Sequence, residues 1–180
     1  VVPKSHDCLS LCTIASMNDR KGQERVVDGI VKSGIKCKYF CVGRIDDKIA
    51  ERIKNKVTGS NVDIKILGTK SPSEIREILS DVDYMILPSS SEGFGLVFLE
   101  AIGCGVPVVL PQNLPILEEE GMIKPGINAI LLENSTADAI AKSLPVLCKT
   151  HFNHNTVSET VINYTWDNIA RQYYDSLCRL

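Results

Sequence analysis

Short apolar runs alternate along this chain with segments in which apolar residues recur at the spacing of a helix. The apolar runs predict buried strands at 9–15, 37–42, 62–67, 82–87, 107–110 and 129–132. The intervening segments predict helices at 23–32, 46–57, 73–79, 96–103, 136–147 and 166–177. Apolar strands that alternate with helices favour a parallel sheet covered on both faces. Because crossovers between parallel strands are right-handed, the predicted fold class is α/β, a Rossmann-like, doubly wound parallel sheet.

The length and charge of the chain limit the classes of function. With 180 residues, of which 44% are hydrophobic, it is expected to form one domain over residues 1–180. It has 20 Lys and Arg against 22 Asp and Glu, so its net charge of -2 favours neither nucleic acid nor an anionic membrane. No run approaches the roughly 20 apolar residues of a membrane span, and the first residues lack the order of a secretion signal. We therefore expect a soluble, cytoplasmic domain, with 151–155 as its only linker-like segment.

The seven cysteines are scattered through apolar runs, and their odd number suits buried thiols in a reducing compartment. Cys8 and Cys12, and likewise Cys37 and Cys41, have a spacing that resembles a zinc-ligand pair. On a strand, however, such residues lie about 13 Å apart on one face, too far to share a metal whose bonds measure about 2.3 Å. Only pairing across two strands would bring them together. The sequence thus predicts ordinary core packing and no metal site.

The loop after the predicted strand at 82–87 is the most unusual of the loops that follow strands. Gly93 and Gly95 stand in it just before the predicted helix at 96–103. In an open parallel sheet, ligands bind beyond the carboxyl ends of the strands. Glycines let the backbone approach a ligand closely, and free amides at a helix N-terminus donate to phosphate oxygens. The pattern predicts an anion site, with a structural tight turn as the alternative.

Two carboxylates flank this glycine turn. Glu92 precedes the predicted helix, whereas Glu100 lies about two turns inside it among apolar residues. A rise of about 1.5 Å per residue separates them by roughly 12 Å, which exceeds the spacing of glycosidase carboxyl pairs. They are therefore not an acid–base couple of that kind. We expect Glu100 to bind a diol such as a ribose, with Glu92 near the opposite end of the same ligand; a Glu100 that merely faces solvent is the alternative.

The segment 91–101, followed by 105–109, resembles the signature of Glu, seven residues and Glu that marks the retaining GT-B glycosyltransferases, especially their fourth family. Further segments resemble that family in the same order, from the first strand to the closing helix. They are Lys21-Gly22, 39–43, 62–68, 83–89 and 164–167. The resemblance covers essentially the whole chain, and it implies the C-terminal half of a GT-B glycosyltransferase.

The resemblance implies a role for each matching residue. Glu100 would bind the ribose hydroxyls of the nucleotide, and Glu92 would face the donor sugar. Lys21 would neutralise the diphosphate leaving group, which stabilises charge that grows in the transition state; a solvated loop lysine is the alternative. Gly68 and Thr69 would meet the base, largely through backbone groups. The sugar and diphosphate would be held by the backbone amides of Gly93, Phe94, Gly95, Leu96 and Val97.

One position departs from the family pattern. The family usually carries an arginine five residues before the lysine, and this position is Ser16 here. Either a phosphate contact is missing, or Arg20 or Arg44 replaces it from a neighbouring loop, and we rank Arg44 lower because nothing fixes its direction. The chemistry of the family needs no metal and no cofactor. A UDP- or GDP-linked sugar is the expected donor.

These implications define the expected function, a hexosyltransferase-type glycosyltransferase that transfers a sugar from a nucleotide diphosphate with retention. The chain starts at 1–4 just before the first predicted strand, as if cut at an interdomain linker. The N-terminal acceptor domain is therefore expected in the parent chain or in a partner subunit, and any membrane contact would come through that domain. The isolated domain is expected to bind a nucleotide sugar and to transfer nothing. The alternatives are a non-catalytic nucleotide-sugar-binding regulatory module, or an epimerase or phosphorylase of the same architecture.

Overall fold

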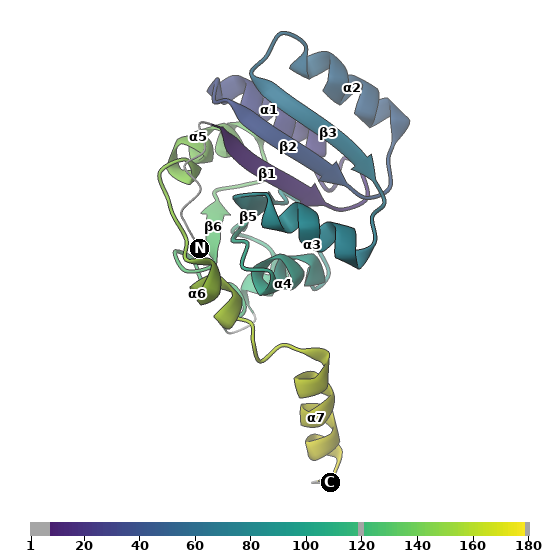
Figure 1. Ribbon diagram of the computed structural model, residues 1–180, viewed down its shortest axis with the longest axis vertical. Helices are drawn as coiled ribbons and strands as arrows, with labels where there is room; N and C mark the ends of the chain where they lie inside the picture. The colour runs from purple at the N-terminus through teal and green to yellow at the C-terminus, as the bar shows by residue number, and fades with distance from the viewer. Residues whose placement is uncertain (1–7, 119–120, 179–180) are drawn as a thin grey trace.

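A computed structural model describes residues 8–118 and 121–178, and its centre is a six-stranded sheet in which all neighbouring strands pair in parallel (Figure 1). The strand order is β3-β2-β1-β4-β5-β6. The strands are β1 (Leu9–Ile14), β2 (Cys37–Val42), β3 (Val62–Gly68), β4 (Tyr84–Ile86), β5 (Val108–Pro111) and β6 (Ala129–Leu132). The predicted α/β, doubly wound fold class is confirmed. The predicted linker at 1–4 lies outside the described residues.

Helices cover both faces of this sheet (Figure 1). Helices α1, α2 and α5 share one buried cluster, which includes Val26, Ile53 and Ile140. Helices α3, α4 and α6 share the other, which includes Leu79 and Phe98. The helices are α1 (Gln23–Ser33), α2 (Asp47–Val57), α3 (Pro72–Ser80), α4 (Leu96–Gly103), α5 (Ala137–Leu147), α6 (His154–Glu159) and α7 (Trp166–Leu177), with a 3-10 turn at Pro115–Leu117. Apolar residues of the predicted helices α1 to α5 therefore face the sheet, whereas α7 buries none of its residues.

Helix α3 begins one residue before the predicted start at Ser73, and Ser71 caps it. The Ser71 hydroxyl accepts a hydrogen bond from the Glu74 amide at 3.4 Å, and the Glu74 carboxylate accepts one from the Ser71 amide at 2.9 Å. This reciprocal pair requires an acidic residue three positions after the cap. Ser73 is followed at that distance by Arg76, so it cannot complete the arrangement. Pro72 takes the first helical position, where a missing amide costs nothing.

Two further predictions are wrong, one for a strand and one for a linker. Strand β4 is shorter than the predicted 82–87, because the Val82 amide still bonds to the end of α3, at 3.5 Å from the Leu79 carbonyl oxygen. The segment 151–155 is not a linker, because α6 begins within it. Asn153 caps this helix by accepting hydrogen bonds from two following amides, at 3.0 and 3.1 Å, and Val157 is fully buried against α4 and the sheet.

The strand cysteines pack in the core, as predicted. Cys12, Cys37 and Cys41 are buried free thiols. Burial raises the pKa of Cys41 to about 12, so this thiol stays protonated at neutral pH. The remaining cysteines do not follow the prediction of buried thiols, because Cys8 is half-buried and Cys104, Cys148 and Cys178 are exposed. Within residues 8–118 and 121–178, no three metal-ligating side chains gather into a possible metal site.

Helix α7 lies apart from the rest of the molecule (Figure 1). None of its residues is buried, and Trp166 at its start is 77% exposed. The Thr165 hydroxyl caps the helix by accepting a hydrogen bond from the Asn168 amide at 3.3 Å. Neither α7 nor any other helix in the described part of the chain has the length and apolar character needed to cross a bilayer.

Candidate functional site

The order in which the chain adds strands to the sheet reverses between β1 and β4. These two strands are neighbours in space, although α1, α2 and α3 separate them in sequence. In doubly wound sheets, ligands bind outside the carboxyl ends of the strands at such a switch point. The segment 15–22 follows β1 and the segment 87–95 follows β4. We call these two segments the switch-point loops. The Ser90 amide of one donates a 3.0 Å hydrogen bond to the Arg20 carbonyl of the other, so the loops lie in direct contact.

Charged side chains from the two switch-point loops meet. Lys21 Nζ donates to both carboxylate oxygens of Glu92, at 2.5 and 2.7 Å. The Ser89 hydroxyl also donates to Glu92, and Arg20 Nη1 lies 3.7 Å from Glu92 Oε2. The Lys21 side chain is only 14% exposed and that of Glu92 only 7%. Shielding from water strengthens the Coulombic attraction of such a pair. The structure thus brings three predicted site residues, Lys21, Glu92 and Arg20, into one cluster.

The end of the second loop enters α4 without a capping side chain. Gly95 occupies the cap with φ 79, and a Cβ added there would lie 2.8 Å from the Phe98 ring, so only glycine fits. The first backbone amide of this region that has a partner is that of Phe98, which donates a hydrogen bond to the Gly95 carbonyl at 2.9 Å. No hydrogen bond among the described residues uses the amides of the predicted ligand-binding stretch 93–97. These amides stand at the positive end of the α4 dipole and are available to an anion.

Helix α1 also begins at a glycine with no capping side chain, Gly22, whose φ is 80. The buried Gln23 supports the preceding loop, because its Nε2 donates to the carbonyls of Ala15 and Ser16, at 3.4 and 3.3 Å. Ser16 therefore contributes a backbone carbonyl to the loop. Its hydroxyl brings no positive charge to the position where the family pattern has an arginine.

The loops after β2 and β3 continue the same edge of the sheet. The Gly43 amide donates to the Gly68 carbonyl at 2.8 Å. A Cβ added at Gly43 would lie 2.3 Å from the Ala15 carbonyl oxygen, so this glycine permits a close approach to the β1 loop. Gly68 has φ 69 and is followed by the exposed Thr69. The predicted base-binding residues therefore adjoin the switch-point loops through Gly43.

Arg20 and Arg44, the two candidates for the missing arginine, differ in their placement. Arg20 Nη1 donates to the Ser91 carbonyl at 2.6 Å and thus reaches the opposite switch-point loop. Arg44 is exposed, and its side chain makes no hydrogen bond or ion pair with the described residues. Its carbonyl accepts from the Met17 amide at 2.8 Å. Of these two arginines, Arg20 is therefore the one that joins Lys21 and Glu92 at the switch-point loops.

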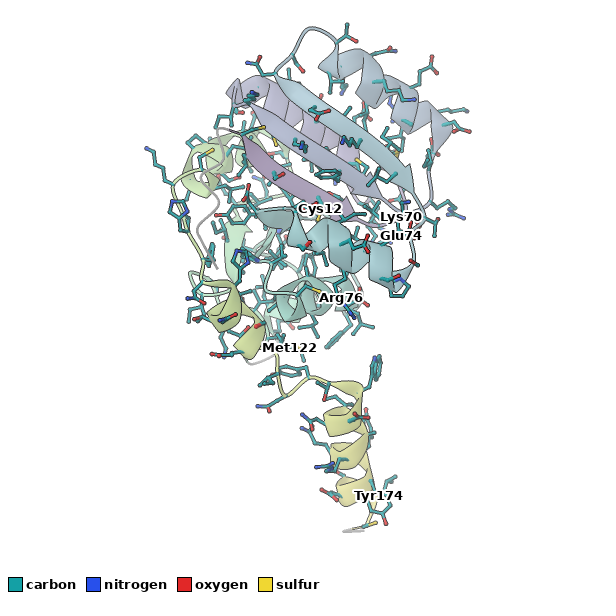
Figure 2. The ribbon with its side chains drawn as sticks, in the orientation of Figure 1. Cys12, Lys70, Glu74, Arg76, Met122 and Tyr174 are labelled. Atoms are coloured by element: carbon teal, nitrogen blue, oxygen red, sulfur yellow. The ribbon has the colours of Figure 1, made fainter. Side chains whose placement is uncertain are left out.

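Glu100 lies on α4 and is exposed, and its carboxylate makes no hydrogen bond or ion pair with the described residues. Figure 2 shows another carboxylate for comparison, that of Glu74, beside Lys70 at the start of α3. Lys70 Nζ donates to it at 2.9 Å, and this contact, with two hydrogen bonds from Ser71, lowers the pKa of Glu74 to about 2. Glu74 is thus committed to a structural pair, whereas Glu100 is free to accept hydroxyl groups.

Three polar residues shape the switch point and were missed by sequence reasoning. Ser89 is fully buried and bonds to Glu92, Gln23 is 1% exposed under the first loop, and Arg25 donates to carbonyls of both loops. The sequence held one signal for them. Gln23 stands in the helical register of the apolar residues Val26 and Ile30, and a polar side chain in such a stripe needs hydrogen-bond partners.

The fold and this edge of the sheet define a class of protein, a doubly wound α/β domain whose switch point adjoins a helix N-terminus with amides unpaired among the described residues. Residues 3–157 match the family described as glycosyl transferases group 1. The chain therefore belongs to the group 1 glycosyl transferases.

Similar proteins are about twice as long as this chain. An uncharacterized glycosyltransferase of Methanocaldococcus jannaschii is 27% identical over 166 residues, which cover 88% of this chain and 45% of that protein. HepE of Anabaena, solved in complex with UDP and glucose, matches with a TM-score of 0.74 and 20% identity over 97% of this chain and 49% of its own. The lipopolysaccharide outer core galactosyltransferase WaaB matches with a TM-score of 0.77 and 16% identity over 98% and 51%. These structural likenesses show the shared fold.

Proposed function

We propose that this chain is the donor-binding half of a retaining hexosyltransferase and that it binds a nucleotide diphosphate sugar at the switch point. The observation that carries the proposal is the convergence of Lys21, Arg20 and the unpaired amides of 93–97 where β1 and β4 meet. Two cations beside a helix N-terminus suit a diphosphate, because both provide donors and positive charge. Membership of the group 1 family supports the same reading.

The remaining site residues fit the other parts of such a donor. Glu100 has a free carboxylate, which suits the two adjacent hydroxyls of a ribose. Gly68 and Thr69 would contact the base, from the loop that Gly43 joins to the first switch-point loop. Glu92 would face the sugar. A UDP- or GDP-linked sugar remains our proposed donor, bound without a metal or cofactor.

The pair of Lys21 and Glu92 implies an exchange of partners when the donor binds. A diphosphate would compete with the Glu92 carboxylate for Lys21 Nζ. Ser89 would continue to hold Glu92 while that carboxylate turns toward the sugar. As the bond between sugar and phosphate breaks, negative charge grows on the leaving diphosphate. Lys21 and Arg20 would then stabilise the transition state more than the bound donor.

Because the chain spans about half the length of its relatives, we propose that the acceptor site belongs to another part of the whole protein or to a partner subunit. The 180-residue chain alone would then bind donor without transferring sugar. Turnover of a nucleotide sugar by the purified chain would contradict this part of the proposal. The alternative, a non-catalytic binding module, rests on Ser16 in place of an arginine, and the placement of Arg20 weakens it.

Thermal shift with UDP-, GDP- and ADP-sugars tests donor binding, because a bound ligand stabilises the folded state, by about 2.7 kcal/mol at a hundredfold excess over Kd. Glu100→Ala should abolish the shift. Glu77→Ala is the matched control, since Glu77 is also an exposed helical glutamate but lies on α3. Wild-type behaviour of Glu100→Ala would refute the ribose assignment. If no nucleotide sugar shifts the wild-type chain, donor binding itself is wrong.

A further inference from the structure

Arg25, in the first turn of α1, bonds to backbone carbonyls of both switch-point loops. Its Nη1 donates to the Asp19 carbonyl at 2.6 Å, and its Nη2 donates to the Arg20 carbonyl at 3.2 Å. The same Nη2 donates to the Pro88 carbonyl at 2.9 Å. The first two acceptors belong to the loop after β1 and the third to the loop after β4. One guanidinium therefore connects the two loops across the switch point.

The loop leaves room for this guanidinium by having a glycine beside it. A Cβ added at Gly22 would lie 2.5 Å from Arg25 Nη2 and 2.8 Å from its Cζ. Real Cβ atoms do not approach so closely, so any other residue at position 22 would displace the guanidinium. The Lys21-Gly22 pair thus has two roles in this chain, a cation at the first position and space for Arg25 at the second.

The hydrogen bonds of Arg25 fix the peptide that carries the site cations. The Arg20 carbonyl, which Arg25 holds, also accepts the Ser90 amide at 3.0 Å. That carbonyl belongs to the peptide bond between Arg20 and Lys21. Its orientation therefore sets where both side chains leave the backbone, one toward Ser91 and one toward Glu92.

The contacts of Arg25 differ from those of an ordinary stabilising arginine in the same region. Arg52 on α2 pairs with the carboxylates of Glu24 and Asp19. Arg25 makes no ion pair within the described part of the chain, and all of its hydrogen-bond acceptors there are backbone carbonyls. The planar guanidinium of an arginine can donate to several carbonyls at once, whereas a lysine donates only from its one ammonium nitrogen.

We propose that Arg25 is a positioning residue for the donor diphosphate. It holds the loop of Arg20 and Lys21 against the loop of Glu92, so that the two cations are already aimed when the donor arrives. It acts through these residues and does not itself contact the donor. This inference rests on the proposed function, because it assumes that the two cations bind a diphosphate.

The test compares nucleoside diphosphates with their nucleosides by titration calorimetry on the 180-residue chain. The variants are Arg25→Met and Arg25→Lys, and the control is Arg76→Met, an exposed arginine on α3 (Figure 2). We expect both Arg25 variants to weaken UDP or GDP binding about tenfold, the equivalent of one good hydrogen-bonded contact, while uridine or guanosine affinity stays within about twofold. Arg25→Met added to the double variant Arg20→Met, Lys21→Met should cause little further loss, because Arg25 acts through these two cations.

For Arg25→Met, two outcomes would overturn the inference while the proposed function stands. One is a diphosphate affinity equal to that of the wild-type chain. The other is an equal loss for diphosphate and nucleoside, which is the behaviour of a general structural residue. Rescue by Arg25→Lys would instead show that charge alone matters, and it would also refute positioning by the planar guanidinium.

A second measurement needs no ligand and therefore separates this inference from the proposed function. Arg25→Met should speed hydrogen exchange at the Ser90 amide by about tenfold or more relative to Arg76→Met, because the Arg20 carbonyl that accepts it loses its support. The Met85 amide, which bonds within the sheet, serves as the internal control for folding. If the wild-type chain binds no nucleotide, the proposed function fails. Unchanged exchange at Ser90 refutes the positioning role itself.

Discussion

The two switch-point loops lie against each other but are held in different ways. In the loop after β1, the side chains of Gln23 and Arg25 donate hydrogen bonds to backbone carbonyls, and the Asn18 side chain accepts one from the Lys21 amide at 3.0 Å. In the stretch 93–97 after β4, no amide is bonded within the described chain, and nothing lies within 4 Å of a Cβ added at Gly93. The fold thus presets the cations and leaves the amides open. Preset groups lose little freedom on binding, and open amides can adapt to the ligand.

The largest predicted effect comes from disturbing the supported loop at Gly22. Gly22→Ala places a methyl group 2.5 Å from Arg25 Nη2 and forces φ +80 on alanine. Left-handed backbone costs about 1–2 kcal/mol, and moving the guanidinium off its carbonyl acceptors costs about 1–2 kcal/mol more, so we expect the free energy of unfolding in urea to fall by about 3 kcal/mol. Gly34→Ala is the control, because Gly34 also has positive φ, 69, but nothing within 4 Å. It should lose only about 1 kcal/mol. Equal losses would mean that Arg25 is not seated under Gly22.

The next effect tests the open stretch through Gly93. Its φ is not in the left-handed region and its surroundings are empty, so Gly93→Ala should change the free energy of unfolding by less than about 0.5 kcal/mol. Nucleotide-sugar affinity should nevertheless fall about tenfold, because the methyl group stands where a ligand would approach the amides. Gly103→Ala adds a methyl group at the far end of α4 and should leave affinity unchanged. Wild-type affinity in Gly93→Ala would show that the open amides are not a ligand surface.

A smaller effect is expected for the ion pair that joins the loops. A double-mutant cycle of Lys21→Met and Glu92→Gln, followed by urea unfolding, should give a coupling free energy of about 1 kcal/mol, because the pair is largely shielded from water. The exposed pair of Lys32 and Asp138 is the comparison, with side chains 60% and 66% exposed. Its coupling should be smaller and should vanish in high salt. A Lys21–Glu92 coupling that salt removes equally well would contradict the shielding.

The smallest effect concerns Glu74, at the rim of the same edge. Its folded pKa, lowered to about 2 from an ordinary value of 4.5 by Lys70 and Ser71, means that the folded state favours the ionised carboxylate. The resulting stabilisation is present above pH 4.5 and is lost as the pH falls toward 2. An NMR titration of the Glu74 carboxyl should therefore show a midpoint well below 4.5, and Lys70→Met should raise it. A midpoint near 4.5 in the wild-type chain would contradict the capping geometry.

The sheet and its helices were predictable because their signals are local. Helices α4 and α7 begin and end at the predicted residues. Helix α6 was missed because it is short and buries only Val157, which gives no periodic pattern. The cap of α3, Ser71, could have been found from its spacing to Glu74.

The candidate site was predictable only in part. Lys21, Glu92 and the glycines could be selected by type and by family resemblance, but the bond between Lys21 and Glu92 depends on the pairing of β1 with β4. Arg25 carried no signal at all, because its acceptors are backbone carbonyls and every residue has one. Arg20 was preferred over Arg44 in the sequence, and the structure gives the physical reason in its bond to Ser91.

The position of the site between β1 and β4 also has a consequence for the order of folding. The side-chain contacts that join the loops, from Arg20 to Ser91 and from Lys21 to Glu92, connect residues 71 positions apart. Closing such a long loop costs more entropy than pairing β1 with the nearby β2, and long-range strand pairing is slow. During refolding, competence to bind a nucleotide is therefore expected to appear later than most of the helical signal. The site would then report when the two halves of the sheet have joined.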